Sequence, residues 1–357
     1  MIASNIAVDL IESGITNVNA MITRNIPIDI EPLIRKHNDD LSRIDASMIE
    51  SIRGYSANEE ILIFPTQYQP FVLHYNKDIF DRFGVEYPKA GSTWNELIDL
   101  ARRLTKFEDG IQYRGLDAGL NINRMYMQLS LPFVDEETGK SVINSHPGWK
   151  KMFQTYQDIY SIPGNLPVRQ NGRVQLGAST PLFLEDQIIA MFPHLISIAY
   201  EAFRKPIEEG MNMGISTFPV FEENPKRSTG FFGQGYSIPV NSRDPDFAFK
   251  VLEHLTSDEV QLEYARMGIA TPLANEAVQA ALFEGNEIAE MVGLDVSLVY
   301  ALEIAPPAKS SYWDAQAVGV VNAKLNELVR GELDVNTALR LADEEINSII
   351  EANPKPE

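Results

Sequence analysis

Short apolar runs alternate with amphipathic helical segments along most of this chain of 357 residues. Residues 61–64 and 71–75 are rich in β-branched and aromatic side chains and predict strands. Residues 97–104 instead repeat apolar side chains at helical spacing. This alternation is typical of an α/β protein. Because a chain of this length exceeds what one hydrophobic core usually serves, we expect two compact domains.

Helix starts are marked by side chains that satisfy otherwise unpaired backbone N–H groups. Thr93 and Glu96 have the spacing of a capping box and predict a helix that runs through Leu104. Thr256 and Glu259 have the same spacing and predict another helix start. Two further starts are predicted by the capping residues Asp244, which precedes Pro245, and Asp334.

Other segments carry expectations about conformation. Residues 5–13 predict a short helix that follows a strand fragment at residues 1–3. Residues 135–139 predict a chain reversal, which we prefer to a calcium loop because the ligand spacing of a calcium-binding hand is absent. Residues 161–181 lack apolar periodicity and predict a long loop. The apolar face expected for the helix after Asp244 consists of Phe247, Ala248, Val251, Leu252 and Leu255.

Composition narrows the possible classes of function. The 50 acidic and 30 basic residues give a net charge of −20, without a basic stripe that interleaves aromatic residues, so we expect no nucleic-acid partner. The chain has no cysteine, and its five histidines show no HxxxH or HxH spacing, so we expect neither thiol chemistry nor a metal site nor another cofactor. No apolar run is long enough to span a bilayer, and residues 1–14 lack the features of a secretory signal.

Four segments share a recognisable pattern. Residues 71–105 contain a strand ending in Tyr75-Asn76-Lys77-Asp78, a short helix, and Thr93-Trp94 at the start of a longer helix. Residues 186–192 (DQIIAMF) form an apolar strand, residues 230–273 a Gly-rich strand followed by two helices, and residues 310–346 the terminal helices. In this order, and over nearly the whole chain, they resemble extracellular solute-binding proteins of family 1, the maltose-binding-protein-like sugar-binding proteins of ABC transporters.

The resemblance implies an α/β fold of two lobes, the type II periplasmic-binding-protein fold, with hinge strands between the lobes. One lobe would comprise residues 1–73 and 236–285, and the other residues 74–235 and 286–357. Relatives carry a signal, a lipid-attachment cysteine, a strand, a helix and a second strand before the point that aligns with residues 1–14, so these elements are expected to be missing here.

The function implied by the resemblance is capture, not catalysis. A monomer would bind a sugar or oligosaccharide in the cleft between its lobes and deliver it to the permease subunits of an ABC importer. The implied location is extracytoplasmic, as a cell-surface lipoprotein or in the periplasm.

A sugar presents hydroxyl groups at its rim and CH groups on its faces, so we expect aromatic rings beside amide or charged side chains in the cleft. The resemblance places Gln67, Tyr68 and Gln69 there, although an exposed polar turn between two prolines explains these residues equally well. Asn5 matches a polar contact position of the relatives, and helix capping is an equally good explanation.

A glycine-flanked run holds three more candidates: Phe232, Gly233 and Gln234. We favour a binding role for this run because a core strand has little reason to contain three glycines in six residues, whereas missing side chains let backbone approach a ligand or bend at a hinge. Arg124 and Tyr126 follow another Gly-containing segment and could enter the cleft, but solvated loop positions are the preferred explanation.

Phe192 and His194 follow the end of a strand after which the relatives place ligand contacts. For His194, a satisfied core histidine is the preferred alternative. Trp313 stands at the head of a predicted helix, where a buried tryptophan is commonly structural. The resemblance favours stacking of Trp313 on a sugar ring.

Two other functions stay open. A glycoside hydrolase would need two carboxylates across a cleft, and among 50 acidic residues some pair can always be nominated. The motifs GxSxG, GxxxxGK[ST] and HExxH are absent. A sugar sensor that docks on a receptor would use the same fold, and the sequence does not separate it from a transport protein.

Overall fold

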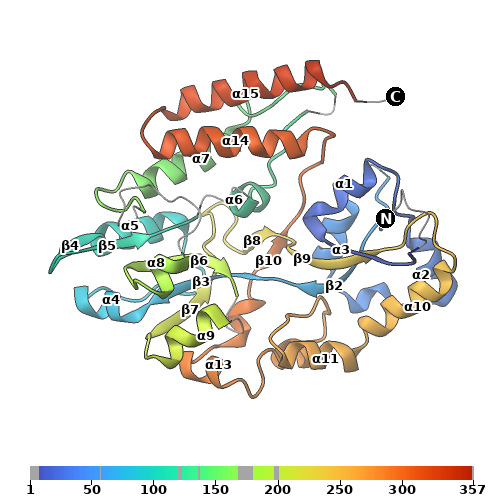
Figure 1. The fold of residues 1–357 in the computed structure, drawn as a ribbon, viewed down its shortest axis with the longest axis horizontal. Coiled ribbons are helices and arrows are strands. Elements are labelled where there is room, and N and C mark those ends of the chain that lie inside the picture. The colour runs from blue at the N-terminus through green and yellow to red at the C-terminus, as the bar shows by residue number, and fades with distance from the viewer. Residues whose placement is uncertain are drawn as a thin grey trace. The chain divides into compact units, whose positions relative to one another are not determined.

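The computed structural model describes residues 8–56, 58–119, 123–135, 137–167, 180–196 and 201–355. The chain divides into two compact units, each assembled from segments that are far apart in the sequence (Figure 1). Unit 1 comprises Met1–Pro70, Thr229–Asn286 and Glu303–Ser310. Unit 2 comprises Phe71–Ser228, Glu287–Leu302 and Ser311–Glu357.

Unit 1 contains a three-stranded antiparallel sheet in the order β1-β9-β2. Its strands are β1 (Ile11–Gly14), β9 (Gly233–Ser237) and β2 (Phe64–Tyr68). Phe64, at the start of β2, meets Phe249 of α10 edge to face, with 5.9 Å between the ring centroids. The other elements of unit 1 are η2 (Ile15–Asn17), α1 (Val18–Ile22), α2 (Glu31–His37), η3 (Leu41–Arg43), α3 (Ala46–Arg53), α10 (Pro245–Leu255), α11 (Asp258–Arg266), α12 (Glu276–Ala280) and β10 (Glu303–Ala305).

Two predictions for the strands of unit 1 are wrong. The helix predicted at residues 5–13 is contradicted where the structure describes it, because Ile11–Gly14 pairs with β9 as a strand. The strand predicted at residues 61–64 begins only at Phe64 and continues through the segment predicted as a turn. Pro65 is tolerated in β2 because this strand lies at the edge of the sheet, where a missing N–H costs little.

The start of α10 is confirmed, and its predicted apolar face is confirmed except at Phe247. Val251 and Leu255 are half-buried. Asp244 caps the helix by accepting a hydrogen bond from the N–H of Phe247 at 2.9 Å. The side chain of Phe247 lies in the first turn and is 65% exposed, contrary to the prediction. The buried residues of α10 are Ala248, Phe249 and Leu252.

The capping box predicted at Thr256 and Glu259 is wrong by one residue. Ser257 is the N-cap of α11 and accepts a hydrogen bond from the N–H of Val260 at 3.4 Å. The hydroxyl of Thr256 instead donates to the carbonyl of Leu252 at 2.8 Å, at the end of α10. Thr256 is therefore the C-cap of α10, and its neighbour Ser257 is the N-cap of α11.

Unit 2 contains a five-stranded sheet in the order β4-β5-β6-β3-β7. The central part is buried, since all six residues of β3 lie in the interior. β3 runs antiparallel to both β6 and β7, whereas β5 and β6 are parallel. The strands are β3 (Phe71–Asn76), β4 (Lys106–Glu108), β5 (Ile111–Leu116), β6 (Ile189–Leu195) and β7 (Met213–Thr217).

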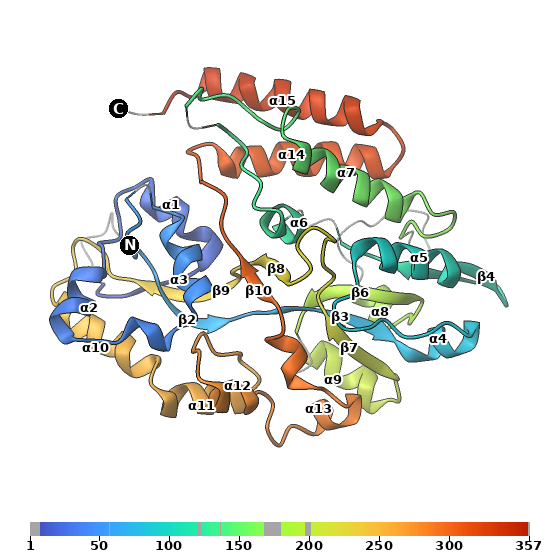
Figure 2. The ribbon, with the colours of Figure 1, turned by 180° about the vertical axis from the view of Figure 1, so that it is seen from behind.

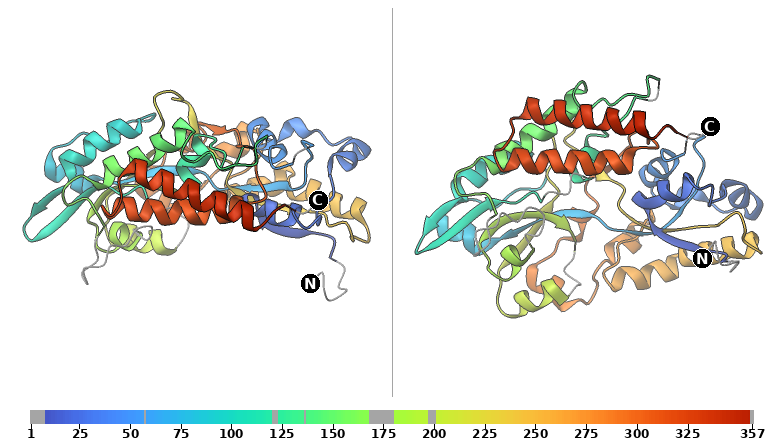
Figure 3. Two further views of the ribbon diagram at one scale, coloured as in Figure 1. Left: turned by 90° about the horizontal axis from the view of Figure 1, so that it is seen from above. Right: turned by 45° about the horizontal axis from the view of Figure 1, so that its top comes forward.

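The terminal helices of unit 2 lie side by side with a helix from the middle of the chain. Figure 2 shows α14 (Asp314–Val329) and α15 (Val335–Ala352) next to α7 (Pro147–Tyr160), and the views in Figure 3 agree. α5 (Trp94–Leu104) packs against β5, and its predicted capping box of Thr93 and Glu96 is confirmed. Asp334 caps α15 as predicted. The remaining elements are α4 (Lys77–Phe83), α6 (Asn123–Gln128), α8 (Thr180–Leu184), α9 (Glu201–Glu208), β8 (Arg227–Gly230), α13 (Glu287–Val292) and η4 (Val296–Val299).

The reversal predicted at residues 135–139 is confirmed. The N–H of Asp135 donates to the carbonyl of Lys140 at 2.8 Å, and Gly139 has a φ of +63°. Within the long loop predicted at residues 161–181, α8 begins at Thr180, and residues 168–179 lie outside the described part. None of the helices in the described ranges is long and apolar enough to cross a membrane.

Candidate functional site

Six predicted site residues of unit 1 lie together on and beside two neighbouring strands. Gln67 lies opposite Gln234 in the ladder between β2 and β9, and Tyr68 lies opposite Gly233. The N–H of Gln69 donates to the carbonyl of the residue before Gly233 at 2.8 Å, which extends the pairing beyond the strands. We call this group the β2–β9 cluster and define it as Gln67, Tyr68, Gln69, Phe232, Gly233 and Gln234. Asn5 lies outside the described residues.

The β2–β9 cluster combines a rigid backbone with partly accessible side chains. Tyr68 is buried and packs against Phe231 with 6.0 Å between the ring centroids. The side chains that stay half-buried are those of Gln67, Gln69, Phe232 and Gln234. Three amides that can each donate and accept, next to a phenyl ring, are suited to a ligand with hydroxyl groups and apolar faces.

Close contact between the two strands requires glycine in β9. A Cβ at Gly233 would lie 2.1 Å from the carbonyl oxygen of Gln67, and one at Gly235 would lie 2.5 Å from that of Phe64. Real Cβ atoms do not approach backbone oxygens so closely, so larger residues would push the strands apart. The glycines therefore let β9 approach β2, as the sequence suggested for a backbone that needs close contact.

A bulge in β2 decides which side chains the cluster presents. Pro65 pairs with Gly235 and Gln67 with Gln234, so Thr66 is an extra residue in the strand. A bulge re-aims the side chains that follow it, because successive side chains of a regular strand alternate between faces. The bulge was not predicted from the sequence. The one residue that indicates an irregular strand here is Pro65, directly before the bulge.

In unit 2, Arg124 is buried rather than solvated, which corrects the preferred explanation of a solvated loop position. It lies on α6 with 8% of its surface exposed, and its guanidinium carbon is 5.5 Å from the centroid of the Phe71 ring. Its Nη1 donates to the carbonyl of Ala118 at 2.7 Å. Burial lowers the pKa of Arg124 from its usual value, and nearby Tyr156 and Asp117 oppose this shift.

Arg124 belongs to a buried polar group that the sequence did not reveal, consisting of Asp117, Arg124, Tyr156 and Tyr160. The carboxylate of Asp117 accepts hydrogen bonds from the Tyr160 hydroxyl and from the N–H of Gly119. Burial raises the pKa of Asp117, and the two hydrogen bonds lower it in part. The rings of Tyr156 and Tyr160 stack one helical turn apart, with centroids separated by 6.4 Å.

Three polar atoms of this group have no hydrogen-bond partner among the residues that the structure describes: Asp117 Oδ2, Arg124 Nε and the Tyr156 hydroxyl. The charges of Asp117 and Arg124 each oppose part of the pKa shift that burial imposes on the other. The sequence contained only a weak indication of this buried polar group. It consisted of an aspartate directly after β5 and of two tyrosines four residues apart on α7.

Tyr126, two residues after Arg124 on α6, is half-buried in an aromatic group. Its ring stacks on Trp149 at 6.1 Å and meets Phe133 at 5.1 Å, measured between centroids. These contacts hold Tyr126 against α7, so the solvated loop position preferred for it from the sequence is not what the structure shows.

Phe192 and His194 lie within β6, so the prediction that they follow the end of the strand is wrong. Their rings stack on each other with centroids 4.9 Å apart. Phe192 is buried, and His194 is half-buried. Burial, helped by the positive charge of Arg124, lowers the pKa of His194 to about 4. His74 on β3 is fully buried beside Phe203, and burial followed by the effect of His194 lowers its pKa to about 3.

Trp313 immediately precedes α14 and is half-buried. Its Nε1 donates to the carbonyl of Asn353 at 2.7 Å, and its ring meets Tyr312 edge to face at 5.6 Å. The next residue, Asp314, accepts a hydrogen bond from the Ser311 hydroxyl, and burial raises the pKa of Asp314 to about 6.

No metal centre emerges from these residues. Within the described part of the chain, no group of three or more histidine, aspartate or glutamate residues is arranged to hold a metal ion. The chemistry that the candidate residues offer is hydrogen bonding by amides and contact by aromatic rings.

A chain of two α/β units, one of which presents amides and a phenyl ring from adjoining strands, has the architecture of a binding protein for polar ligands. The family described as bacterial extracellular solute-binding protein matches residues 1–262, and the chain belongs to this family. The resemblance stated from the sequence is therefore confirmed. No curated protein sequence matches the chain closely enough to count as a relative.

Solved structures confirm the predicted two-lobe α/β fold. A sugar transporter from Rhizobium etli in an open conformation is 18% identical and superposes with a TM-score of 0.76, covering 95% of this chain and 84% of the other. An ABC substrate-binding protein from Listeria monocytogenes in complex with cycloalternan is 18% identical, with a TM-score of 0.73 and coverage of 98% and 87%. The sugar-binding protein MalE from Xanthomonas citri is 16% identical, with a TM-score of 0.75 and coverage of 98% and 86%.

Proposed function

We propose that this solute-binding protein captures a sugar or oligosaccharide and delivers it to the permease subunits of an ABC importer. The observation that carries the proposal is the β2–β9 cluster, in which three half-buried amides adjoin the ring of Phe232 on a rigid pair of strands. The similar proteins point to the same ligand class, since one holds cycloalternan and two are named for sugars. No step of the proposed function breaks a covalent bond.

Contacts of Phe232 and Trp313 with the sugar would supply a large part of the binding free energy. A covered aromatic side chain buries about 150 to 250 Å², so at roughly 25 cal/mol per Å² Phe232 and Trp313 would together contribute several kcal/mol before the costs of binding. Micromolar affinity requires about 8 kcal/mol. Amide contacts from Gln67, Gln69 and Gln234 to sugar hydroxyls would supply the rest.

The two compact units are, in this proposal, the two lobes that close on the ligand. The chain passes from one unit to the other at 70/71, 228/229, 286/287, 302/303 and 310/311. The lobe boundaries inferred from sequence lie at 73/74, 235/236 and 285/286, without the return to unit 1 at residues 303–310. Trp313 belongs to unit 2, and the β2–β9 cluster belongs to unit 1. Ligand can favour closure only through its higher affinity for the closed form.

The family is extracellular by its description, and we infer that the protein works as a monomer held at the cell surface by a lipid or free in the periplasm. The test of function is a thermal-shift screen against mono- and oligosaccharides, followed by calorimetric titration of the best ligand. A ligand present at one hundred times its dissociation constant stabilises the folded state by about 2.7 kcal/mol. Stabilisation by no carbohydrate would contradict the proposal, and hydrolysis of the bound glycan would support a glycoside hydrolase instead.

A further inference from the structure

The bulge in β2 leaves a backbone carbonyl that needs a partner from elsewhere. Thr66 is the extra residue of the bulge, and such a residue is not paired by the ladder. Thr66 is 2% exposed, so water does not readily reach its carbonyl group. The side chain of Gln261 supplies the missing donor, with its Nε2 at 3.0 Å from the carbonyl oxygen of Thr66.

Gln261 lies on α11, and all of its side chain is buried. Its Nε2 also donates to the carbonyl of Leu255 at 2.8 Å, so both amide hydrogens are used. Its Oε1 accepts a hydrogen bond from the Thr271 hydroxyl at 2.7 Å, and that hydroxyl accepts one from the N–H of Leu273 at 3.1 Å. One buried amide thus joins β2, the end of α10 and the segment after α11, and its orientation is fixed by three hydrogen bonds.

The same segment holds β2 at a second point. The N–H of Tyr68 donates to the carbonyl of Ala270 at 2.8 Å, and Ala270 directly precedes Thr271. The carbonyl of Thr66 and the N–H of Tyr68 are therefore both anchored, and the residue between them is Gln67. The backbone on each side of Gln67 is held from outside the sheet.

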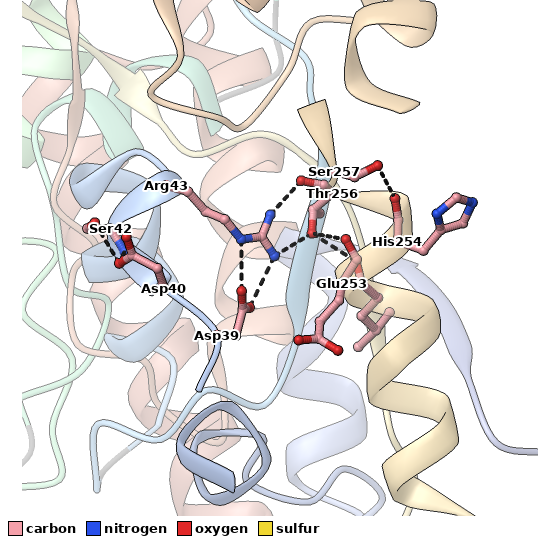
Figure 4. A network of polar contacts seen from close by, with 9 residues as sticks. Asp39, Asp40, Ser42, Arg43, Glu253, His254, Thr256 and Ser257 are labelled. Carbon is pink, nitrogen blue, oxygen red and sulfur yellow. Dashed lines mark hydrogen bonds and ion pairs between the residues drawn. The ribbon is translucent and has the colours of Figure 1, made fainter. Parts of the chain in front are cut away.

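The end of α10, on which Gln261 also depends, is itself fixed by a charged network. Figure 4 shows the guanidinium of Arg43 between Asp39 and Thr256, the residue after Leu255. Arg43 donates to Asp39 Oδ1 at 3.0 Å, and its Nη2 donates to the Thr256 hydroxyl at 2.7 Å. Arg43 Nη1 donates to the carbonyl of Thr256. These contacts anchor Thr256 at the end of α10, next to the carbonyl of Leu255 that Gln261 contacts.

We propose that Gln261 is a positioning residue for ligand binding, because it holds the bulge that presents Gln67 beside Gln234 in the β2–β9 cluster. This role rests on the proposed function. If the bulge were lost, the register would shift by one residue, and the half-buried Gln67 and the buried Tyr68 would exchange faces. The sugar would then meet a different set of side chains even though Gln261 itself does not touch it.

The experiment compares two buried or half-buried glutamines of unit 1 that each donate to a backbone carbonyl. Gln261→Met keeps the size of the side chain and removes its donors. Gln279→Met is the matched control, since Gln279 donates to the carbonyl of Leu273 at 2.8 Å, whereas Gln261 donates to a carbonyl of β2. Sugar affinity is measured by calorimetric titration, and backbone mobility by hydrogen–deuterium exchange at the N–H groups of Tyr68 and Gln69.

We expect Gln261→Met to weaken sugar binding about tenfold or more and to accelerate exchange at Tyr68 and Gln69, because an unsatisfied buried carbonyl favours rearrangement of the bulge. Gln279→Met should leave affinity and exchange within about twofold of the original protein. If the two variants behave alike, Gln261 only fills space or stabilises the fold, and the proposed role is wrong.

A milder variant covers the case in which Gln261→Met does not fold. Thr271→Val removes the hydroxyl that orients the Gln261 amide, and we expect it to reduce affinity about threefold and to increase exchange at Tyr68. Unchanged affinity and exchange in Thr271→Val would also overturn the role of Gln261. If the original protein binds no sugar, the proposed function fails, and the exchange measurements still decide whether Gln261 holds the bulge.

Discussion

The indole N–H of Trp313 donates a hydrogen bond to the main-chain oxygen of Asn353, 2.7 Å away, just beyond the last helix. The ring is thus oriented by the chain segment that follows α15. A ring fixed in this way loses little conformational freedom on binding, which is an advantage for a stacking contact.

Replacing Trp313 with Ala should weaken binding of the best sugar by about tenfold or more, because the stacking area is lost. Since Trp313 is only half-buried, the protein should stay folded, as judged by circular dichroism and thermal unfolding. Trp313→Phe keeps a ring and should retain most of the affinity. Equal affinity of Trp313→Ala and the unchanged protein would remove Trp313 from the site.

Replacing Gln234 with Ala should weaken sugar binding by about threefold to thirtyfold, the effect of losing a hydrogen bond to a ligand hydroxyl. Gln234 is half-buried and lies opposite Gln67 in the β2–β9 cluster. The matched control is Gln154→Ala, since Gln154 is exposed on α7 and its side chain donates to Gln157 and Asp158 of the same helix. Calorimetric titration should separate the two variants, and indistinguishable affinities would exclude Gln234 from ligand contact.

Acid should destabilise unit 2 through His74 and His194, whose pKa values are lowered in the folded state. The pKa values of His74 and His194 are lowered to about 3 and about 4 in the folded state from an ordinary 6.5, so the unfolded state binds more protons between these values. The free energy of unfolding should therefore be highest above pH 6.5 and fall as the pH drops towards 4. Each unit of pKa difference corresponds to about 1.4 kcal/mol.

Urea unfolding at pH 7 and at pH 5 measures this loss. His74→Phe should reduce it, because a phenyl group takes up no proton in the unfolded state. The replacement suits the site, where the ring lies beside Phe183 and Phe203. His254→Gln changes an exposed histidine and should leave the loss unaltered. A His74→Phe variant with the same pH dependence as the unchanged protein would contradict the role of His74.

The buried charges of Asp117 and Arg124 should depend on each other. Arg124→Met leaves the carboxylate of Asp117 buried without its opposite charge and should cost about 3 to 5 kcal/mol of stability. Adding Asp117→Asn should recover part of that loss, because a neutral amide no longer needs the guanidinium. Additive losses in a double-mutant cycle of urea unfolding would show that the two groups do not stabilise each other.

Local features of the fold were predictable from the sequence because their causes lie within a few residues. The capping box of Thr93 and Glu96, the caps at Asp244 and Asp334, and the reversal at Gly139 all follow from short-range hydrogen bonding. Thr256 was misassigned because it shares the capping chemistry of Ser257, and only its contacts with Leu252 and Arg43 distinguish the two.

Features that depend on distant segments were not predictable from one sequence. Ile11–Gly14 is a strand because β9 pairs with it, although its sequence fits a helix equally well. The clustering of Gln67 with Gln234 follows from a register between segments more than one hundred and sixty residues apart along the chain. The family resemblance placed these residues in one predicted cleft, whereas the strand pairing that brings them together and the bulge at Thr66 appear only in three dimensions.

The glycines of β9 have a consequence for how such a protein can change its ligand. Gly233 and Gly235 tolerate no side chain against β2, whereas Phe232 and Gln234, which alternate with them, carry side chains that stay half-buried. Substitutions at positions 232 and 234 can therefore accumulate without changing the contact between β9 and β2. A library that randomises positions 232 and 234, with 233 and 235 left as glycine, would be the economical route to a binding protein of altered selectivity.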